Sequence, residues 1–320
     1  MYTLGPDFLK RARNLEYCAE MIASQDSATL DGEVFVEVTD ANFCRERLCP
    51  VCAGLKSRKM GLQVASVYYK HKELYPSEVP ILLTLTKRNN EYPDLKAGMK
   101  ELSDGFLKLR KRQEFVDAVT GWYSCKEVTT NYSAKQFHPH MHILMMVPKA
   151  YFDKKRGLYI EHDTWVRLWQ ECLGVDYKPS VYVNSVMKRV GKTNKRGQII
   201  TEEGAIAEVT KYVVKPGDVL CRNHKGEIWA DPEIVRYLQL GLKGAHLTAK
   251  GGTFRVLAKE VGWQDVEDTK TKLTDGAHIP PEAVPVARAI LQWRVGANLE
   301  DSGYVEVLRQ QMEDRFRKAA

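Results

Sequence analysis

Three histidines within five residues are the first feature of this sequence that could do chemistry. His138, His140 and His142 stand in the segment HPHMHILMMV. Alternate side chains of a β-strand share one face, so the three imidazoles are expected to project together. Imidazoles spaced in this way can converge on one metal ion or one phosphate. Every second residue from Met141 to Val147 is apolar, which predicts that the opposite face of the strand packs on a core.

A carboxylate joins this group if the preceding segment forms the neighbouring strand. The segment GWYSCKEVTT (residues 121–130) is separated from the histidines by the polar loop NYSAKQ. With a turn centred near residue 133, antiparallel pairing sets Glu127 opposite His140 on the same face. Two neutral imidazoles and one carboxylate suit a divalent cation such as Mg²⁺ or Mn²⁺. Glu127, His140 and His142 are therefore the expected metal ligands, and His138 is a further candidate.

A second reactive group is expected on a helix that covers about residues 205–215 and ends at Pro216. Glu208, Tyr212 and Lys215 stand at positions i, i+4 and i+7, which places them on one stripe of that helix. A tyrosine hydroxyl has a pKa of about 10, so it becomes a useful nucleophile only beside cationic groups. Glu208, one turn away, could activate a water molecule. Without the histidines, the same spacing would describe an ordinary amphipathic helix.

Cysteines form a third cluster. Cys44, Cys49 and Cys52 lie within nine residues, and the chain has seven cysteines, an odd number. Such clustering favours metal binding over disulfide bonds. A tetrahedral structural Zn²⁺ has four ligands, and Cys18 is the preferred fourth, with His71 as the second candidate. The alternative is a set of reduced thiols packed as small hydrophobic groups.

Basic residues gather near these clusters and predict contacts with DNA. One group precedes and enters the expected tyrosine helix: Lys188, Arg189, Lys192, Lys195, Arg196 and Lys211. A second surrounds the cysteines: Arg45, Arg47, Lys56, Arg58 and Lys59. If these residues neutralise DNA phosphates, DNA binding should weaken steeply as the salt concentration rises. Tyr132 or Trp122 could stack on unpaired bases. The alternative interpretation of each group is a solvated charged surface.

Composition is consistent with a folded protein that binds an anionic partner. The 320 residues are 44% hydrophobic and 28% charged, with a net charge of +7. These values exclude a disordered acidic chain, a collagen-like chain and a disulfide-dense mini-protein. No apolar run approaches the roughly 20 residues of a membrane helix, and charges interrupt the first residues, unlike a secretory signal. We expect a soluble, cytoplasmic protein without membrane contact.

The elements that must position these groups can be outlined from periodicity. Helices are expected over residues 7–25, 53–69 and 97–119, and again from about residue 305 to the end. Strands are expected near residue 33 and over residues 81–86, 121–130, 138–147 and 181–186. The expected domains are a helical, cysteine-rich zinc region (1–75), a catalytic domain (76–255) and a C-terminal segment of unknown role (256–320).

Four motifs, in this order along the chain, resemble those of the rolling-circle plasmid replication initiators of the HUH endonuclease superfamily. They are CRERLCPVC (44–52), LLTLT (82–86), HPHMHILMMV (138–147) and EVTKYVVK (208–215). The last resembles the motif of the branch that has one catalytic tyrosine and a glutamate one helical turn before it. The resemblance covers about residues 10–255. The four motifs together are specific for this family, whereas no single motif would be sufficient.

This resemblance implies an α+β fold with a central antiparallel sheet flanked by helices, a ferredoxin-like or RRM-like core. It implies that Tyr212 nicks one strand at the plasmid's double-strand origin, where the DNA is single-stranded near the nick. The products are a 5′-phosphotyrosine link and a 3′-OH primer, and Glu208 supports the terminating cleavage. Host helicase and DNA polymerase in a prokaryotic cytoplasm are the implied partners. A homodimer is left open.

Three other classes share parts of this pattern. A single-tyrosine transposase or a conjugative relaxase would use the same chemistry. The His-x-His-x-His pattern also matches the histidine-triad nucleotide hydrolases, which use a histidine nucleophile and no metal. A non-catalytic zinc protein that binds DNA would carry the cysteines, with the histidines as structural residues.

Overall fold

The chain forms two compact units in the computed structural model. One comprises residues 1–59 and 265–320, and the other comprises residues 60–264. The described residues are 4–186, 191, 202–210, 214–215, 218–222, 228–268, 270–274, 280, 282–294 and 303–312. Among them, no helix combines the length and the apolar character that a membrane crossing requires.

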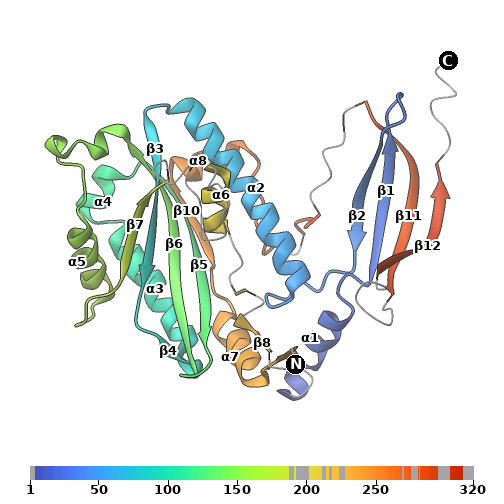
Figure 1. The fold of residues 1–320 in the computed structure, drawn as a ribbon, viewed down its shortest axis with the longest axis horizontal. Coiled ribbons are helices and arrows are strands. Elements are labelled where there is room, and N and C mark those ends of the chain that lie inside the picture. The colour runs from blue at the N-terminus through green and yellow to red at the C-terminus, as the bar shows by residue number, and fades with distance from the viewer. Residues whose placement is uncertain are drawn as a thin grey trace. The chain divides into compact units, whose positions relative to one another are not determined.

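A central antiparallel sheet organises the larger unit (Figure 1). Its strand order is β10-β5-β6-β3-β7, and the short β4 pairs with the start of β6. The bounds are β3 (Glu78–Thr86), β4 (Asn90–Glu91), β5 (Gly121–Asn131), β6 (Gln136–Pro148), β7 (Val181–Ser185) and β10 (Thr248–Gly252). The predicted α+β fold with a central antiparallel sheet is confirmed.

Helices cover this sheet and bury its apolar side chains. One face packs against α3 (Leu95–Leu109), α4 (Gln113–Ala118) and α5 (His162–Leu173). The core on this face includes Met141, Ile143, Met145 and Val147, the apolar positions that alternate with the histidines. Gly105 lets α3 approach α5 closely, because a Cβ atom there would lie 2.9 Å from the Trp169 ring.

The other described elements of this unit connect or flank the sheet. They are the second half of α2 (Pro50–Leu74), α6 (Glu202–Ala207), α7 (Pro232–Leu242), α8 (Thr253–Glu260), β8 (Leu220–Arg222) and β9 (Ile228–Ala230). Short 3₁₀ turns are η2 (Tyr92–Asp94), η3 (Lys149–Phe152), η4 (Lys154–Arg156) and η5 (Glu208–Thr210). The expected helix over 97–119 is divided into α3 and α4.

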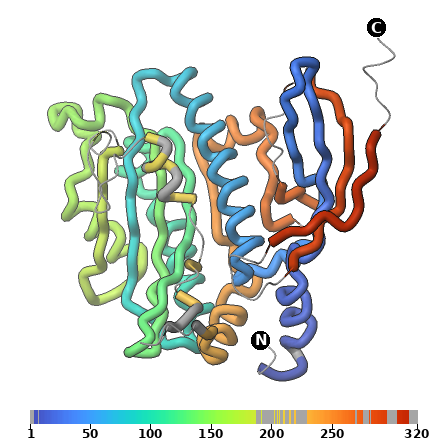
Figure 2. The backbone as a smooth tube through the Cα atoms, turned by 45° about the vertical axis from the view of Figure 1, so that its right-hand side comes forward, coloured from blue at the N-terminus to red at the C-terminus, as the bar shows by residue number. Residues whose placement is uncertain are grey.

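The smaller unit contains a four-stranded antiparallel sheet built from both ends of the chain. Its order is β12-β11-β1-β2, and β11 pairs directly with β1. The bounds are β1 (Met21–Ala28), β2 (Val34–Ala41), β11 (Val284–Arg294) and β12 (Gly303–Gln311), and α1 (Pro6–Glu16) precedes them. The N-terminal and C-terminal strands lie side by side in both views (Figure 1, Figure 2).

Three expectations about the chain ends differ from this structure. The helix expected over 7–25 ends at Glu16, and residues 21–28 form β1 because both edges of this segment find strand partners. The helix expected from residue 305 is strand β12, which pairs with β11. Residues 256–320 do not form a separate segment: α8 belongs to the larger unit, whereas β11 and β12 complete the sheet of the smaller one.

Candidate active site

Strands β5 and β6 place the histidines and the carboxylate on one face. Glu127 pairs directly with His140, as the loop length predicts, and Cys125 pairs with His142. The turn between the strands is short, so the pairing register follows from local sequence. Glu127 is 3% exposed, and its carboxylate therefore lies in a largely dry environment.

One carboxylate oxygen meets both imidazoles. Glu127 Oε2 lies 3.2 Å from His142 Nε2 and 3.5 Å from His140 Nε2. The candidate ligand atoms of the three residues all lie within 4.8 Å of one another. This is a compact site of mixed nitrogen and oxygen donors, which suits a divalent cation.

Hydrogen bonds on the far side of each ring orient the two imidazoles. His140 Nδ1 donates to the His138 carbonyl oxygen at 3.1 Å, and His142 Nδ1 lies 3.0 Å from Thr84 Oγ1. A carbonyl oxygen only accepts, so His140 Nδ1 carries a hydrogen, and Nε2 is the ring nitrogen available to a metal ion. Nε2 faces Glu127 Oε2, so a cation between these two atoms would be bound by both residues. The residues present therefore fit a divalent metal ion.

His138 is held differently. Its Nδ1 lies 2.8 Å from Asn89 Oδ1, and its ring stacks on His140 with centroids 5.2 Å apart. Burial lowers the pKa of His138, and the nearby charges of His140 and Lys87 lower it further. His138 lies outside the group of converging ligand atoms and supports the ring of His140.

Lys215 completes the electrostatics of the site. Its ammonium forms an ion pair with Glu127 Oε1. Burial alone would raise the pKa of Glu127, but hydrogen bonds from His140, His142 and Lys215 outweigh it and hold that pKa well below its usual value. Glu127 is therefore an ionised carboxylate at neutral pH. Nearby, Asp218 accepts a 3.1 Å hydrogen bond from the backbone N–H of Thr130, and burial raises its pKa.

The expected tyrosine helix is described only in part. Residues 202–207 form α6, and Glu208 begins the 3₁₀ turn η5. Thr210 packs on α2, where a Cβ atom at Gly61 would lie 3.3 Å from its Oγ1. Tyr212 and Lys211 lie outside the described residues, as do Lys188, Arg189, Lys192, Lys195 and Arg196.

Comparisons with known proteins identify the family. A family model described as "Replication protein" matches residues 35–304. The chain belongs to this family of replication proteins. It is 32% identical over 273 residues to "Protein rep" of a Bacillus species, with 82% of this chain and 85% of that protein covered. "Protein rep" of Bacillus amyloliquefaciens is 31% identical (82% and 76% covered), and that of Streptococcus pneumoniae is 32% identical (71% and 66%). No solved structure shows significant similarity.

This membership confirms the resemblance to plasmid replication initiators drawn from the four motifs. It favours that interpretation over the transposase, relaxase and histidine-triad hydrolase alternatives. A replication initiator acts on the DNA of its origin, so DNA is the partner that this membership implies.

The cysteines of this replication protein meet in the smaller unit. Cys18 Sγ lies 3.4 Å from Cys52 Sγ and 3.5 Å from Cys49 Sγ, and Cys44 Sγ lies 3.7 Å from Cys52 Sγ. Four sulfurs around Zn²⁺ at about 2.3 Å have edges of about 3.8 Å, so this spacing fits a tetrahedral zinc site. Cys18 is thus placed beside the other three, whereas His71 bonds to Glu78 and Thr253.

The surroundings of these sulfurs favour negative charge. The backbone N–H of Cys44 donates to Cys18 Sγ, and that of Arg45 donates to Cys52 Sγ. Hydrogen bonds among the four thiols lower the pKa values of Cys18 and Cys49 and raise those of Cys44 and Cys52. A cation among the four sulfurs would stabilise all of them as thiolates, so the donor set also fits Zn²⁺ chemically.

Basic residues beside the cysteines have structural partners. The Arg45 guanidinium donates to the carbonyl oxygens of Asp268 and Thr271, and Lys59 Nζ donates to that of Lys272. Arg47 and Lys56 form ion pairs with Glu267. Four of the five basic residues predicted here as a DNA surface thus bind residues 267–272, and Arg58 is exposed.

Sequence reasoning missed several members of the site. Thr84 belongs to the LLTLT motif, yet its hydrogen bond to His142 depends on the pairing of β3 with β6. Asn89, which holds His138, carries no sequence signal. Trp122, a candidate for base stacking, is 5% exposed on the opposite face of β5, whereas Tyr132 is exposed in the turn before β6.

Proposed function

We propose that this replication protein nicks one strand of its plasmid origin by a metal-dependent tyrosine transesterification. The observation that carries the proposal is the convergence of Glu127, His140 and His142 on one face of the sheet, with their candidate ligand atoms within 4.8 Å of one another. Family membership supports the DNA substrate. Host helicase and DNA polymerase would then extend the strand in the bacterial cytoplasm.

The proposed metal site uses Mg²⁺ or Mn²⁺. A divalent cation held by Glu127, His140 and His142 would supply Lewis-acid stabilisation of the negative charge that develops on a phosphate. Thr84 and the His138 carbonyl oxygen fix the two imidazoles, and Lys215 keeps Glu127 ionised. The chain's own residues therefore preorganise the donor set before DNA arrives.

In the proposed reaction, the Tyr212 hydroxyl loses its proton and attacks the scissile phosphorus. The new phosphorus–oxygen bond to tyrosine replaces the bond to the 3′ oxygen, which takes up a proton and leaves as the 3′-OH primer. Lys215 carries the positive charge that favours the ionised phenol. At termination, Glu208 accepts a proton from water, and the resulting hydroxide breaks the phosphotyrosine bond and restores the tyrosine.

Zinc in the smaller unit is a separate part of the proposal. Cys18, Cys44, Cys49 and Cys52 would hold a structural Zn²⁺, because four sulfurs close the coordination shell and leave no position for substrate. The ion would fix α1, the loop before α2 and the start of α2 relative to one another.

The proposal is tested by incubating the protein with supercoiled plasmid that carries its origin. We expect relaxation that requires Mn²⁺ or Mg²⁺ and leaves a covalent 5′ adduct on the protein. Tyr212→Phe should abolish the adduct and the nick, and His140→Ala should abolish nicking while specific binding of origin DNA persists. Glu208→Ala should nick once and then accumulate covalent complex. Nicking by Tyr212→Phe, or nicking in excess chelator, would contradict the mechanism.

A further inference from the structure

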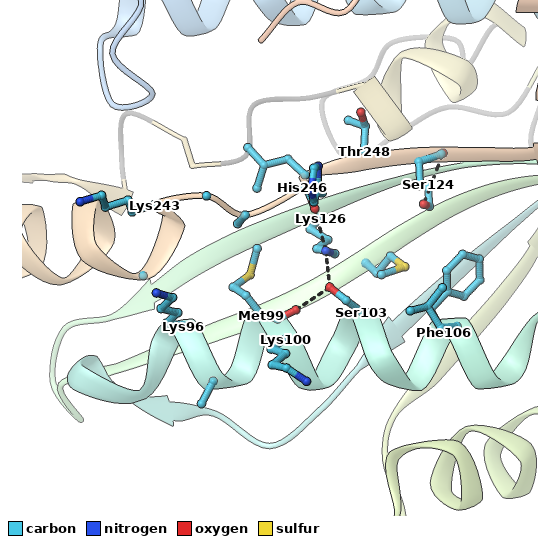
Figure 3. Close-up of a pocket in the computed structure, with 18 of the residues that line it drawn as sticks. Lys96, Met99, Lys100, Ser103, Phe106, Ser124, Lys126, Lys243, His246 and Thr248 are labelled. Atoms are coloured by element: carbon cyan, nitrogen blue, oxygen red, sulfur yellow. Dashed lines mark hydrogen bonds between the residues drawn. The ribbon is translucent and has the colours of Figure 1, made fainter. Parts of the chain in front are cut away.

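A cavity of about 810 Å³ lies within the larger unit between α3, β5 and the segment 241–249 (Figure 3). Trp122, Ser124 and Lys126 line it from alternate positions of β5. Alternate side chains of a strand share one face, so the cavity lies on the side of the sheet opposite Glu127. It is therefore distinct from the candidate metal centre.

A buried lysine faces this cavity: burial lowers the pKa of Lys126 to about 8, and the charge of Asp104 acts on it without forming an ion pair. Lys126 is 8% exposed, and its Nζ donates to Ser103 Oγ and, at 2.7 Å, to the His246 carbonyl oxygen. An ammonium has three donors, so one is left over. Within the described part of the chain, no carboxylate forms an ion pair with Lys126. Buried charges are normally paired, and this one points to an anionic ligand.

The face of α3 that lines the cavity changes from basic to aromatic along its length (Figure 3). Lys96 and Lys100 stand near its start, with Lys243 across the cavity. Lys100 pairs with Asp104, whereas neither Lys96 nor Lys243 forms an ion pair with a described residue. Ser103, one helical turn on, meets the buried lysine. The basic end therefore has positive charge available for more than one anionic group.

The other end of the cavity is apolar and aromatic. Phe106 meets Trp122 edge to face, with ring centroids 4.9 Å apart, and Met141 lies beside them on β6. The Arg110 guanidinium lies 5.7 Å from the centre of the Trp122 ring. Such a wall accepts a flat aromatic group. A cavity of this volume is typical of small-molecule sites with a few placed polar groups.

We propose that this cavity binds a nucleoside phosphate. The phosphate accepts the remaining donor of Lys126, which Ser103 Oγ holds in place, with the basic end beside it, and the base lies against Phe106, Trp122 and Met141. Inorganic phosphate would leave the apolar end unfilled, and an uncharged aromatic ligand would leave Lys126 without its anion. A nucleoside phosphate satisfies both ends.

The test is calorimetric titration of the full chain with ADP, without added divalent cation, so that the metal centre does not contribute. We expect a Kd below about 1 mM, with adenosine and inorganic phosphate each at least about tenfold weaker. Lys126→Met should weaken ADP binding by about tenfold or more, because a charged hydrogen bond is lost. The double variant Lys96→Met/Lys243→Met changes only exposed side chains and should also weaken binding by about tenfold.

Matched variants separate this site from general charge and from the nicking proposal. Lys108→Met removes an exposed lysine of α3 outside the cavity and should leave ADP affinity unchanged. His140→Ala should also bind ADP normally. Absence of ADP binding to the native chain, or an ADP affinity in Lys126→Met equal to that of the native chain, would overturn the proposal. So would displacement of ADP by a short oligothymidylate whose own affinity falls equally in Lys126→Met, because the cavity would then be a DNA-strand site.

Discussion

The hydroxyl of Thr84 fixes one ring of the candidate metal centre. It lies 3.0 Å from His142 Nδ1, and the other nitrogen of that ring faces Glu127. Partners of this kind hold a ligating imidazole in one tautomer and one orientation. Thr84 is therefore a positioning residue, whose loss should affect metal affinity before it affects the chemical step.

Thr84→Val keeps the side-chain shape and removes the hydroxyl. We expect the Mn²⁺ concentration for half-maximal nicking to rise by about tenfold to a hundredfold, with activity restored at saturating Mn²⁺. Thr84→Ser should behave like the native protein. Thr86→Val is the matched control on the same strand, because the Thr86 hydroxyl donates to the Ser180 carbonyl oxygen instead of a histidine. A deficit that saturating metal does not restore would argue for a packing defect.

At the scale of elements, a buried histidine–glutamate pair joins four segments of the larger unit. His71 on α2 is fully buried, and its Nε2 lies 2.8 Å from Glu78 Oε2 on β3. Thr120, just before β5, donates to the same carboxylate, and Thr253 at the start of α8 lies 3.1 Å from His71 Nδ1. This network fixes the helices against one end of the sheet that carries the metal ligands.

Glu78→Ala removes the acceptor shared by His71 and Thr120. We expect the free energy of unfolding to fall by about 2–4 kcal/mol, since the fully buried His71 loses its charged partner, whereas Thr120 keeps the Met146 carbonyl oxygen as an acceptor. Urea denaturation of the two proteins measures the difference. Glu73→Ala, an exposed change one residue before the end of α2, should alter stability by no more than about 0.5 kcal/mol. Equal stability of Glu78→Ala and the native protein would show that the network does not stabilise the fold.

At the scale of the whole molecule, both ends of the chain build the smaller unit. Strand β11 pairs with β1 across more than two hundred residues, and Arg309 on β12 forms a 2.6 Å ion pair with Asp26 on β1. Two N-terminal residues, Arg45 and Lys59, donate hydrogen bonds to backbone carbonyl oxygens near the C-terminal strands, those of Asp268, Thr271 and Lys272. The cysteine cluster is therefore embedded in a unit that the N-terminal residues cannot form alone.

Removal of the proposed zinc should make the four cysteines of this unit reactive. In the native protein we expect Cys18, Cys44, Cys49 and Cys52 to resist a thiol reagent until a strong chelator is added, and then to react together as zinc is released. Cys125 provides the internal comparison, because burial, together with the Glu127 charge, raises its pKa to about 12 and should keep it inert in both states. Reaction of the four cysteines at equal rates with and without chelator would contradict a zinc site.

The sequence by itself determined the features that depend on neighbours along the chain. Alternation in HPHMHILMMV placed the histidines on one face, and a short loop placed Glu127 opposite His140, because a tight hairpin leaves one register that buries the apolar face. The cysteine spacing likewise indicated a shared site. Tertiary structure alone decided which distant segments meet: the pairing of β1 with β11, the bond from Thr84 to His142, and the cavity around Lys126. In those contacts, burial and pairing with remote partners outweigh local periodicity, which is why residues 21–28 and 303–311 are strands where a local pattern favoured helix.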